Sequence, residues 1–236
     1  MSSVLAKQLD ELGFTVFAAF SDLSEESQAL KDECSGRLKI IQLNPTSEKQ
    51  LQEAYQFVKN NLPQNAPGLW ALINNNCWAA FGEVEWVPLQ VYERAADYNL
   101  FATIRQHRFF SLSSGKLKII LLIGRIINVS SLAGKVASPV RSPFCSMKFA
   151  LEAFSECLRL ELKKWGVDVV PLSSLFIQYL RTEYFYTDYG EDYFEYKVRT
   201  LPEYRSNQVK SIEIIDYSTD TFFHWYLECS RVLEIM

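Results

Sequence analysis

Glycine and histidine are scarce in this sequence. It has 9 glycines among 236 residues, against an average of roughly 7%, and the first of them is Gly13. Doubly wound nucleotide folds bind phosphate at a glycine-rich turn between their first strand and first helix, and no such turn can lie ahead of Gly13. His107 and His224 are the only histidines, and no C-x-x-C pair accompanies them. We therefore expect no bound metal.

No stretch of the sequence has the length of a membrane span, which needs roughly 18 or more consecutive apolar residues. The longest apolar run, 117–129, is interrupted by Gly124 and Arg125 and is typical of a buried strand. The first residues include Lys7 and Asp10, unlike the apolar core of a secretory signal. We expect neither a transmembrane span nor a cleavable signal in this chain.

A large excess of one charge is also lacking, since the formal net charge is −4. This balance gives no electrostatic reason to expect nucleic acid as a partner. The cysteines are odd in number and scattered, without C-x-x-C spacing; they stand at positions 34, 77, 145, 157 and 229. Such a distribution favours reduced thiols in an intracellular protein.

Segments with helical periodicity alternate with short β-branched and aromatic runs along the chain. The expected helices are 4–12, 24–34, one opening at Ser47, about 88–112 and 142–165, and the expected strands are 14–20, 37–43, 68–74, 117–130 and 167–172. This alternation predicts one α/β domain over 1–236, with a Rossmann-like doubly wound parallel sheet of about six strands. The glycine-rich loop and the first strand are lacking, and because that strand is central in such folds, we expect a gap inside the sheet.

The most informative segment is 128–166, which joins the end of a buried strand to a strongly marked helix start. Ser142 is a suitable N-cap and Pro143 a suitable first helical residue. Phe144 and Lys148 are four residues apart, so they share one helix face. Ser131 precedes Phe144 by thirteen residues, at the carboxyl end of the strand.

This segment resembles the active site of the short-chain dehydrogenase/reductase family, in which a Ser is followed after thirteen residues by Tyr-x-x-x-Lys. The resemblance extends over about residues 4–200 and is greatest to the D-β-hydroxybutyrate dehydrogenase branch. The most specific matches are GLWALINN (68–75), FGEVEW (81–86), RSPFCSMKFALEAFSECLR (141–159) and YGEDYFEYK (189–197). The resemblance implies an oxidoreductase that acts with NAD(P) on a secondary alcohol or ketone such as 3-hydroxybutyrate.

By resemblance, four positions form the catalytic set. Asn99 corresponds to the family's helix Asn that orders a proton-relay water, and Ser131 to the residue that holds the substrate oxygen. Lys148 corresponds to the residue that binds the cofactor ribose and lowers the pKa of the catalytic phenol. Phe144 stands where that Tyr belongs. Since losing a general acid–base slows a reaction on the order of 10²–10⁴-fold, we expect impaired turnover.

The resemblance also implies NAD(H) as cofactor, and it assigns cofactor-binding positions to Asn44, Asn74, Asn75 and Lys148. This sequence departs from the family in the same region. Asn76-Cys77 replaces the Ala-Gly half of the N-N-A-G turn, and Ser174-Leu175 replaces the Pro-Gly pair expected under the nicotinamide. Together with the missing glycine loop, these changes predict weak or absent binding of the cofactor.

Plainer interpretations of the same residues stay open. Phe144 is expected to be a packed core residue, and Lys148 without its Tyr to be a solvated lysine on the helix surface. Asn99 serves equally well as a residue that satisfies buried backbone groups. Cys145 lies at a helix N-terminus, where a thiol pKa can be lowered, and a reactive role there is the less favoured alternative. Tyr98, beside Asn99, is expected to point elsewhere.

The resemblance gives expectations for the remaining chain and for its partners. Residues 179–236 would cover the substrate pocket, and the helices around 88–112 and 142–165 would form homo- or hetero-oligomers. The related branch is mitochondrial. Three hypotheses follow: an enzyme whose start is missing from this chain, a non-catalytic relative that associates with active dehydrogenases, and a decayed copy without function.

Overall fold

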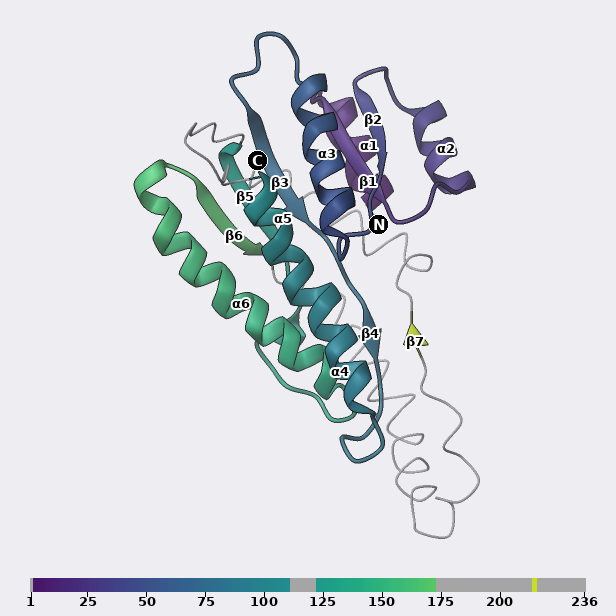
Figure 1. The fold of residues 1–236 in the computed structure, drawn as a ribbon, viewed down its shortest axis with the longest axis vertical. Helices are drawn as coiled ribbons and strands as arrows, with labels where there is room; N and C mark the ends of the chain where they lie inside the picture. The colour runs from purple at the N-terminus through teal and green to yellow at the C-terminus, as the bar shows by residue number, and fades with distance from the viewer. Residues whose placement is uncertain (1, 111–121, 173–213, 216–236) are drawn as a thin grey trace.

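The computed structural model describes residues 2–110, 122–172 and 214–215 (Figure 1). The helices are α1 Ser2–Glu11, α2 Glu25–Glu33, α3 Glu48–Asn61, α4 Leu89–Ala96, α5 Ala102–Phe110 and α6 Ser142–Leu162, with a π-helical turn at Asp97–Phe101 and 3₁₀ turns at Leu132–Gly134 and Lys163–Trp165. The strands are β1 Val16–Phe20, β2 Leu38–Gln42, β3 Leu69–Asn74, β4 Ala79–Ala80, β5 Leu122–Val129, β6 Asp168–Leu172 and β7 Ile214–Ile215. Helices and strands alternate, as the sequence predicts for an α/β fold.

The parallel strands form two separate sheets. One contains β1 and β2, and the other has the order β3-β5-β6, in which every pair is parallel. Among the described residues, no strand joins β1 to β3. The predicted gap in a doubly wound sheet is therefore present, and it lies between β1 and β3. The short strands β4 and β7 pair antiparallel, so Ile214–Ile215 is held against Ala79–Ala80.

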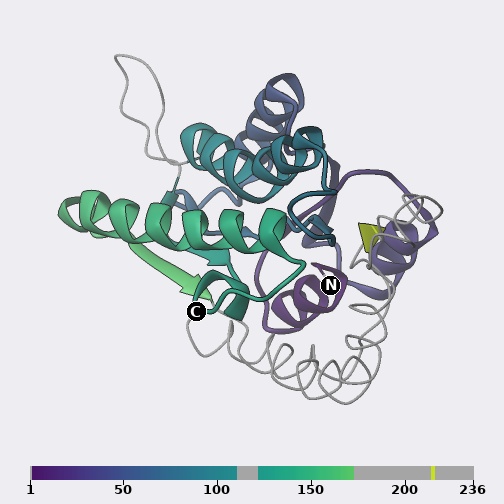
Figure 2. The same cartoon turned by 90° about the horizontal axis from the view of Figure 1, so that it is seen from below.

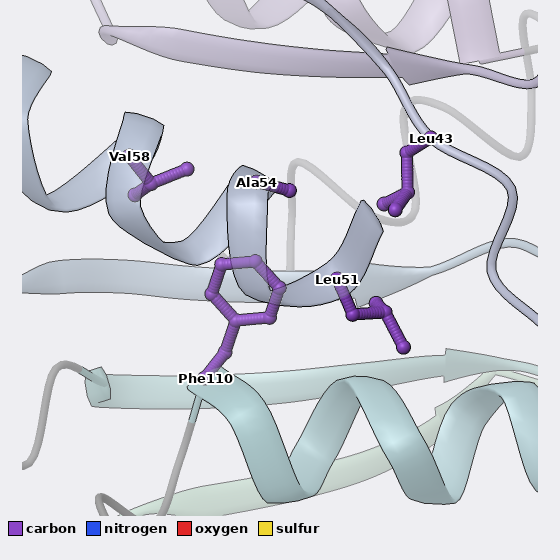
Figure 3. Packing of buried hydrophobic residues seen from close by; sticks show 5 residues of the cluster. All are labelled: Leu43, Leu51, Ala54, Val58 and Phe110. Carbon is purple, nitrogen blue, oxygen red and sulfur yellow. The ribbon is translucent and has the colours of Figure 1, made fainter. Parts of the chain in front are cut away.

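Helices on both faces connect the two sheets. On one face, α3 contributes Leu51, Ala54 and Val58 to a core cluster completed by Leu43 and Phe110 (Figure 3). Apolar residues of both sheets pack against this cluster; they include Phe17 and Ile41 from the first sheet and Leu69 and Leu72 from the second. The two sheets thus share a core under α3 although their strands are not hydrogen bonded.

On the opposite face, α1 performs the same role. Leu5 and Leu9 of α1 form a cluster with Ile127 of β5. Val16 of β1 and Ile73 of β3 pack around it. Figure 2 shows α1 on the other side of the strands from α4, α5 and α6. Both faces of the sheet boundary are therefore covered by helices.

Several helix boundaries follow from local signals in the sequence. Gly13 ends α1 with φ of 92° and Gly166 ends the 3₁₀ extension of α6 with φ of 69°, conformations that glycine adopts without steric cost. Ser47, where the sequence predicts a helix to open, caps α3 by accepting from the Gln50 N–H. The Gln50 side chain accepts from the Asn44 N–H, and the Ser47 N–H donates to the Asn44 carbonyl.

One prediction about the helices needs correction. Ser142 is the first residue of α6 and Arg141 holds the N-cap position, with no side-chain cap hydrogen bond. The Ser142 hydroxyl is instead 2.5 Å from the Tyr92 hydroxyl of α4. The helix expected over about 88–112 runs without a break from Leu89 to Phe110 and contains a π-helical turn at Asp97–Phe101.

Some predictions lie outside the described residues. These are the beginning of the strand expected over 117–130, the Ser174-Leu175 pair and all of 179–236 except Ile214–Ile215. Among the helices in the described part of the chain, none has both the length and the apolar character of a membrane span.

Candidate active site

A chain of buried side-chain hydrogen bonds links the ends of β3 and β5 to α6. Asn74 Nδ2 donates to Asn128 Oδ1 at 2.8 Å, Asn128 Nδ2 donates to Ser155 Oγ at 2.8 Å, and Ser155 Oγ donates to the Leu151 carbonyl at 2.7 Å. A carbonyl can only accept, so the direction of every bond in this chain is fixed. Asn128 and Ser155 are fully buried, and the network therefore locks α6 onto the centre of the three-stranded sheet.

Ser131 lies in the turn that follows β5. Its side chain accepts from the Ala133 N–H at 3.2 Å and caps the 3₁₀ turn Leu132–Gly134. A Cβ on Gly134 would stand 2.8 Å from the Lys148 carbonyl oxygen. This glycine is required because the turn lies directly against the backbone of α6.

Lys148 is buried, with 2% of its surface exposed. Its amine donates to the Val129 carbonyl at 2.9 Å. Burial lowers the pKa of this amine from its ordinary value, and Cys77 and Glu152 oppose that shift less strongly. The expectation of a solvated surface lysine is wrong, because the turn after β5 and the Gly134 contact cover this part of α6.

Phe144 is a packed residue, as expected, with 7% of its surface exposed. It belongs to a cluster with Ala79, Ala133 and Cys145. The Lys148 amine lies 5.6 Å from the centre of the Phe144 ring, a distance that permits a cation–π contact. The ring has no dissociable proton, so Phe144 itself cannot donate one to a carbonyl.

Asn99 lies in the π-helical turn and is fully buried. Its Oδ1 accepts from the Trp78 N–H at 2.9 Å, and its Nδ2 donates to the carbonyls of Trp78 at 2.7 Å and Ala95 at 2.9 Å. Asn99 therefore satisfies buried backbone groups of the segment that leads into β4, as its structural interpretation predicts. Tyr98 turns toward Arg94, whose guanidinium is 5.8 Å from the ring centre.

The predicted cofactor-binding positions fall in two places. Asn74 and Asn75 stand at the end of β3, near the buried network described above. Asn76 extends away from it and exchanges hydrogen bonds with the Gln106 side chain of α5. Asn44 follows β2 in the other sheet, where its side chain accepts from the Thr46 N–H and hydroxyl and stabilises its own turn.

The residues around Lys148 do not fit a bound dinucleotide as they stand. A cofactor ribose would need the Lys148 amine, which already donates to the Val129 carbonyl. Lys148 is also buried, with 2% of its surface exposed. Cys77, which carries a side chain where the resemblance expects glycine, is close enough to influence the Lys148 pKa.

Sequence reasoning missed two residues that organise this region. Asn128 and Ser155 form the centre of the buried network, and the patterns in the sequence assign no role to either. A polar residue at the end of an apolar strand such as LIGRIIN (122–128) is the signal that could have identified Asn128. Ser155 is seven residues after Lys148, so the two lie on one face of α6.

Comparison with known proteins gives the same family for most of the chain. The family model described as short chain dehydrogenase matches residues 2–179. The chain is 35% identical over 225 residues to the mitochondrial D-beta-hydroxybutyrate dehydrogenase of Rattus norvegicus, which covers 85% of this chain and 63% of that protein. It is 36% identical over 170 residues to estradiol 17-beta-dehydrogenase 2 of Mus musculus, covering 71% and 43%. The chain thus spans less than two thirds of the length of these relatives.

Solved structures give the same fold. A dehydrogenase/reductase from Sinorhizobium meliloti superposes with a TM-score of 0.62 at 22% identity, over 71% of this chain and 64% of that one. The sorbitol-6-phosphate 2-dehydrogenase from Erwinia amylovora gives a TM-score of 0.59 at 20% identity, over 71% and 64%.

Proposed function

This chain belongs to the short-chain dehydrogenase family, and from that premise we propose that it is by descent an NAD(P)-dependent oxidoreductase whose turnover is impaired in this sequence. The proposed substrate class is a secondary alcohol or ketone such as 3-hydroxybutyrate. A rat relative named as a D-beta-hydroxybutyrate dehydrogenase supports that class. The same relative is mitochondrial and supports that location, which fractionation of cells expressing the tagged chain would test.

One observation carries the proposed impairment: the residue that faces the Lys148 amine is Phe144. Reduction of a ketone requires a proton donor beside the carbonyl oxygen. The resemblance places that donor at position 144, and a phenyl ring has no proton to supply. The Lys148 amine is itself buried and hydrogen bonded to the Val129 carbonyl, so it is poorly placed to replace the missing phenol as proton donor. Loss of a positioned acid–base costs on the order of 10²–10⁴ in rate.

The direct test combines calorimetric titration of the purified chain with NADH and NADPH with a turnover assay on 3-hydroxybutyrate and acetoacetate. We expect binding weaker than millimolar and turnover at least about 10²-fold below that of an intact family member assayed alongside. Micromolar binding together with ordinary turnover would overturn the proposal.

The substitution Phe144→Tyr separates the two deficits. It restores a phenol at the required position, and we expect it not to rescue turnover because the cofactor would still bind weakly. Phe81→Tyr, which adds a hydroxyl to another aromatic residue at the edge of the same cluster, is the matched control. Full activity of Phe144→Tyr would show that cofactor binding is intact and that only the proton donor is missing.

The runner-up is a non-catalytic family member that associates with active dehydrogenases. Large apolar residues are exposed on the helices expected to form oligomers; they are Leu89 on α4, Phe101 in the π-helical turn, and Phe149 and Leu160 on α6. Such residues favour an interface. Co-purification with a tagged intact relative tests this function. It should be lost in Phe149→Glu and kept in the control Glu156→Gln, which changes an exposed residue of the same helix.

A further inference from the structure

We propose that Cys77 and Cys145 form a reversible oxidation site, in which a peroxide oxidises the Cys77 thiol and Cys145 then closes a disulfide with it. This modification lies outside the proposed dehydrogenase function and does not depend on it. The proposal rests on a small cluster in which both cysteines pack, on their unequal exposure, and on the hydrogen bonds that hold their segments in place.

The first observation is that both cysteines pack in one small hydrophobic cluster. Its buried members are Ala79, Ala133, Phe144 and Cys145, and Cys77 packs against them. Two of the four buried members are alanines, so little side-chain volume separates the elements that meet here. The fold thus brings a thiol of the segment between β3 and β4 to the first turn of α6.

The second observation is that the two thiols differ in exposure. Cys77 is partly exposed, whereas Cys145 is buried, with 4% of its surface exposed. A peroxide in solution therefore reaches Cys77 first, and the buried thiol is left to react with the oxidised sulfur. An accessible thiol with a second cysteine nearby is the arrangement found in redox-sensing cysteine pairs.

The third observation is that hydrogen bonds hold both segments in place. The Asn76 side chain bonds to the Gln106 side chain of α5, and the main chain of Trp78 bonds to Asn99. Cys77 lies between these two anchored residues. The other thiol stands in a turn of α6, where helical hydrogen bonds fix the main chain. The backbone therefore keeps both cysteines at the cluster.

A charged neighbour favours the reactive form of Cys77. The Lys148 amine lies 5.6 Å from the centre of the Phe144 ring, a member of the same cluster. Burial lowers the pKa of Lys148, and the charge of an ionised Cys77 opposes this shift. The attraction is mutual, so the ammonium group also stabilises the Cys77 thiolate, which is the form that attacks a peroxide.

The reaction needs a peroxide as oxidant and no other co-reactant. The Cys77 thiolate attacks one peroxide oxygen: an S–O bond forms, the O–O bond breaks, and the leaving oxygen takes up a proton. The sulfur is oxidised to a sulfenic acid, and hydrogen peroxide is reduced to water. The Cys145 sulfur then attacks the Cys77 sulfur. The S–S bond forms, the S–O bond breaks, and the hydroxyl group leaves with the Cys145 proton as water.

The test oxidises the reduced full chain with about 0.1 mM hydrogen peroxide. The remaining thiols are alkylated, the protein is digested, and the peptides are identified by mass spectrometry. We expect one cross-linked pair, Cys77 with Cys145, lighter than the two peptides by the two thiol hydrogens. Dithiothreitol should separate the pair, because a dithiol reduces a disulfide by exchange. The unsubstituted chain decides the matter, so the result does not depend on the folding of a variant.

Matched variants test the order of the two steps. Cys145→Ser should abolish the cross-link and leave Cys77 as a sulfenic acid that dimedone labels. Cys157→Ser, which changes an exposed cysteine of the same helix, should keep the cross-link. Dimedone labelling of Cys145 in place of Cys77 would reverse the assigned order and overturn the proposal.

Three further results would overturn the proposal. The first is a Cys77 that stays reduced while the exposed Cys157 is oxidised. The second is an oxidised Cys77 whose sulfur is bonded to the Lys148 nitrogen, which would make the amine the partner. The third is a disulfide from Cys77 to Cys34, Cys157 or Cys229.

The contribution of the amine has its own test. Lys148→Met should slow the oxidation of Cys77 at least about threefold, because the thiolate loses an attracting charge. Lys7→Met, which removes an exposed lysine of α1, should leave the rate unchanged. An equal rate in Lys148→Met would contradict the assistance that the proposal assigns to Lys148.

Discussion

The two sheets of this protein differ in how completely they are buried. The three-stranded sheet has a central strand with fully buried Ile126, Ile127 and Asn128, and α6 is bonded to it through Ser155. In the two-stranded sheet only Ala18 and Leu38 are buried. Both sheets share helices, and the difference accompanies the number of strand partners, since β5 pairs with β3 and β6 whereas β1 pairs with β2 among the described residues.

This contrast shows where the family's structure is retained and where it is weakened. A parallel sheet depends on helices and strands on all sides of each strand. β5 has all of these neighbours, whereas β1 has one strand neighbour in the described part of the chain. We expect the three-stranded sheet with α6 to be the most stable part of the molecule and the two-stranded sheet to open first.

The largest expected effect comes from removing a side chain at the centre of the three-stranded sheet. Ile127→Ala should lower the free energy of unfolding by about 4 kcal/mol, because a fully buried isoleucine leaves a cavity. Ile40→Ala, the matched change in partly buried β2, should cost roughly 1–2 kcal/mol. Urea unfolding measures both. Equal losses would contradict the contrast between the sheets.

The next effect tests the polar network. Asn128→Ala removes the acceptor of Asn74 Nδ2 and the donor to Ser155 Oγ, and it should cost about 2–3 kcal/mol because buried polar groups lose their partners. Ser35→Ala removes the hydrogen bond from the Ser35 hydroxyl to the Asp10 carboxylate near the two-stranded sheet. Asp10 keeps the bond from the Ser35 main-chain N–H, so a smaller loss is expected than in Asn128→Ala. A larger loss in Ser35→Ala would reverse our ranking.

The sequence predicted the order of helices and strands because periodicity and glycine signals are local. The helices predicted over 4–12 and 142–165 are followed by Gly13 and Gly166, both with positive φ, and the gap in the sheet followed from the order of strands in doubly wound folds. Spacing also places Phe144 and Lys148 on one helix face, whereas their roles come from the resemblance. What these patterns contain is information about neighbours along the chain.

Predictions failed where segments distant in the sequence determine the surroundings of a residue. The spacing of Lys148 predicts the helix face on which it lies, but not that the turn at Gly134 packs against this part of α6. The side chain of Asn99 bonds to Trp78, which is 21 residues away, and its spacing in the sequence does not predict that partner. Asn74 Oδ1 is a buried acceptor without a hydrogen-bond partner among the described residues. Spacing could not predict this, because it follows from the direction of every bond in the Asn74–Asn128–Ser155 network.

Acid should lower the free energy of unfolding in two separate pH ranges, one set by His107 and the other by Asp10. Burial lowers the pKa of His107 to about 4, from an ordinary value of 6.5. Between these values the unfolded chain binds a proton that the folded one does not, so stability falls as the pH decreases through this window. The loss should reach about 2 kcal/mol between pH 7.5 and 5.

Asp10, beside α2 and the two-stranded sheet, titrates elsewhere. Hydrogen bonds from Ser35 lower its pKa below the ordinary 3.8, so its contribution is present above that pH and is lost only as the pH falls further. The measurement is unfolding at a series of pH values. His107→Gln should flatten the curve between pH 6.5 and 4 while keeping the decline at lower pH. An unchanged curve would mean that His107 is not the group responsible.

The smallest expected effects come from replacing a lysine with methionine, at Lys148 on α6 and at Lys7 on α1. Lys148→Met replaces a buried cation with an apolar side chain of similar length, a change that is often neutral or slightly stabilising. We expect the free energy of unfolding to change by less than about 1 kcal/mol, with any change being an increase. Lys7→Met breaks an exposed contact with Glu33 and should leave the free energy of unfolding almost unchanged, because solvent screens such a pair.

A pH series separates a buried charge from an ordinary one. The lowered pKa of Lys148 means that the unfolded chain holds this proton to higher pH than the folded chain. Stability of the parent protein should therefore rise as the pH approaches 10.5, the ordinary value. Lys148→Met should lack this rise and Lys7→Met should keep it. If Lys148→Met instead destabilises the protein strongly at neutral pH, the bond to the Val129 carbonyl outweighs the cost of burying the amine, and Lys148 has become a structural anchor of α6.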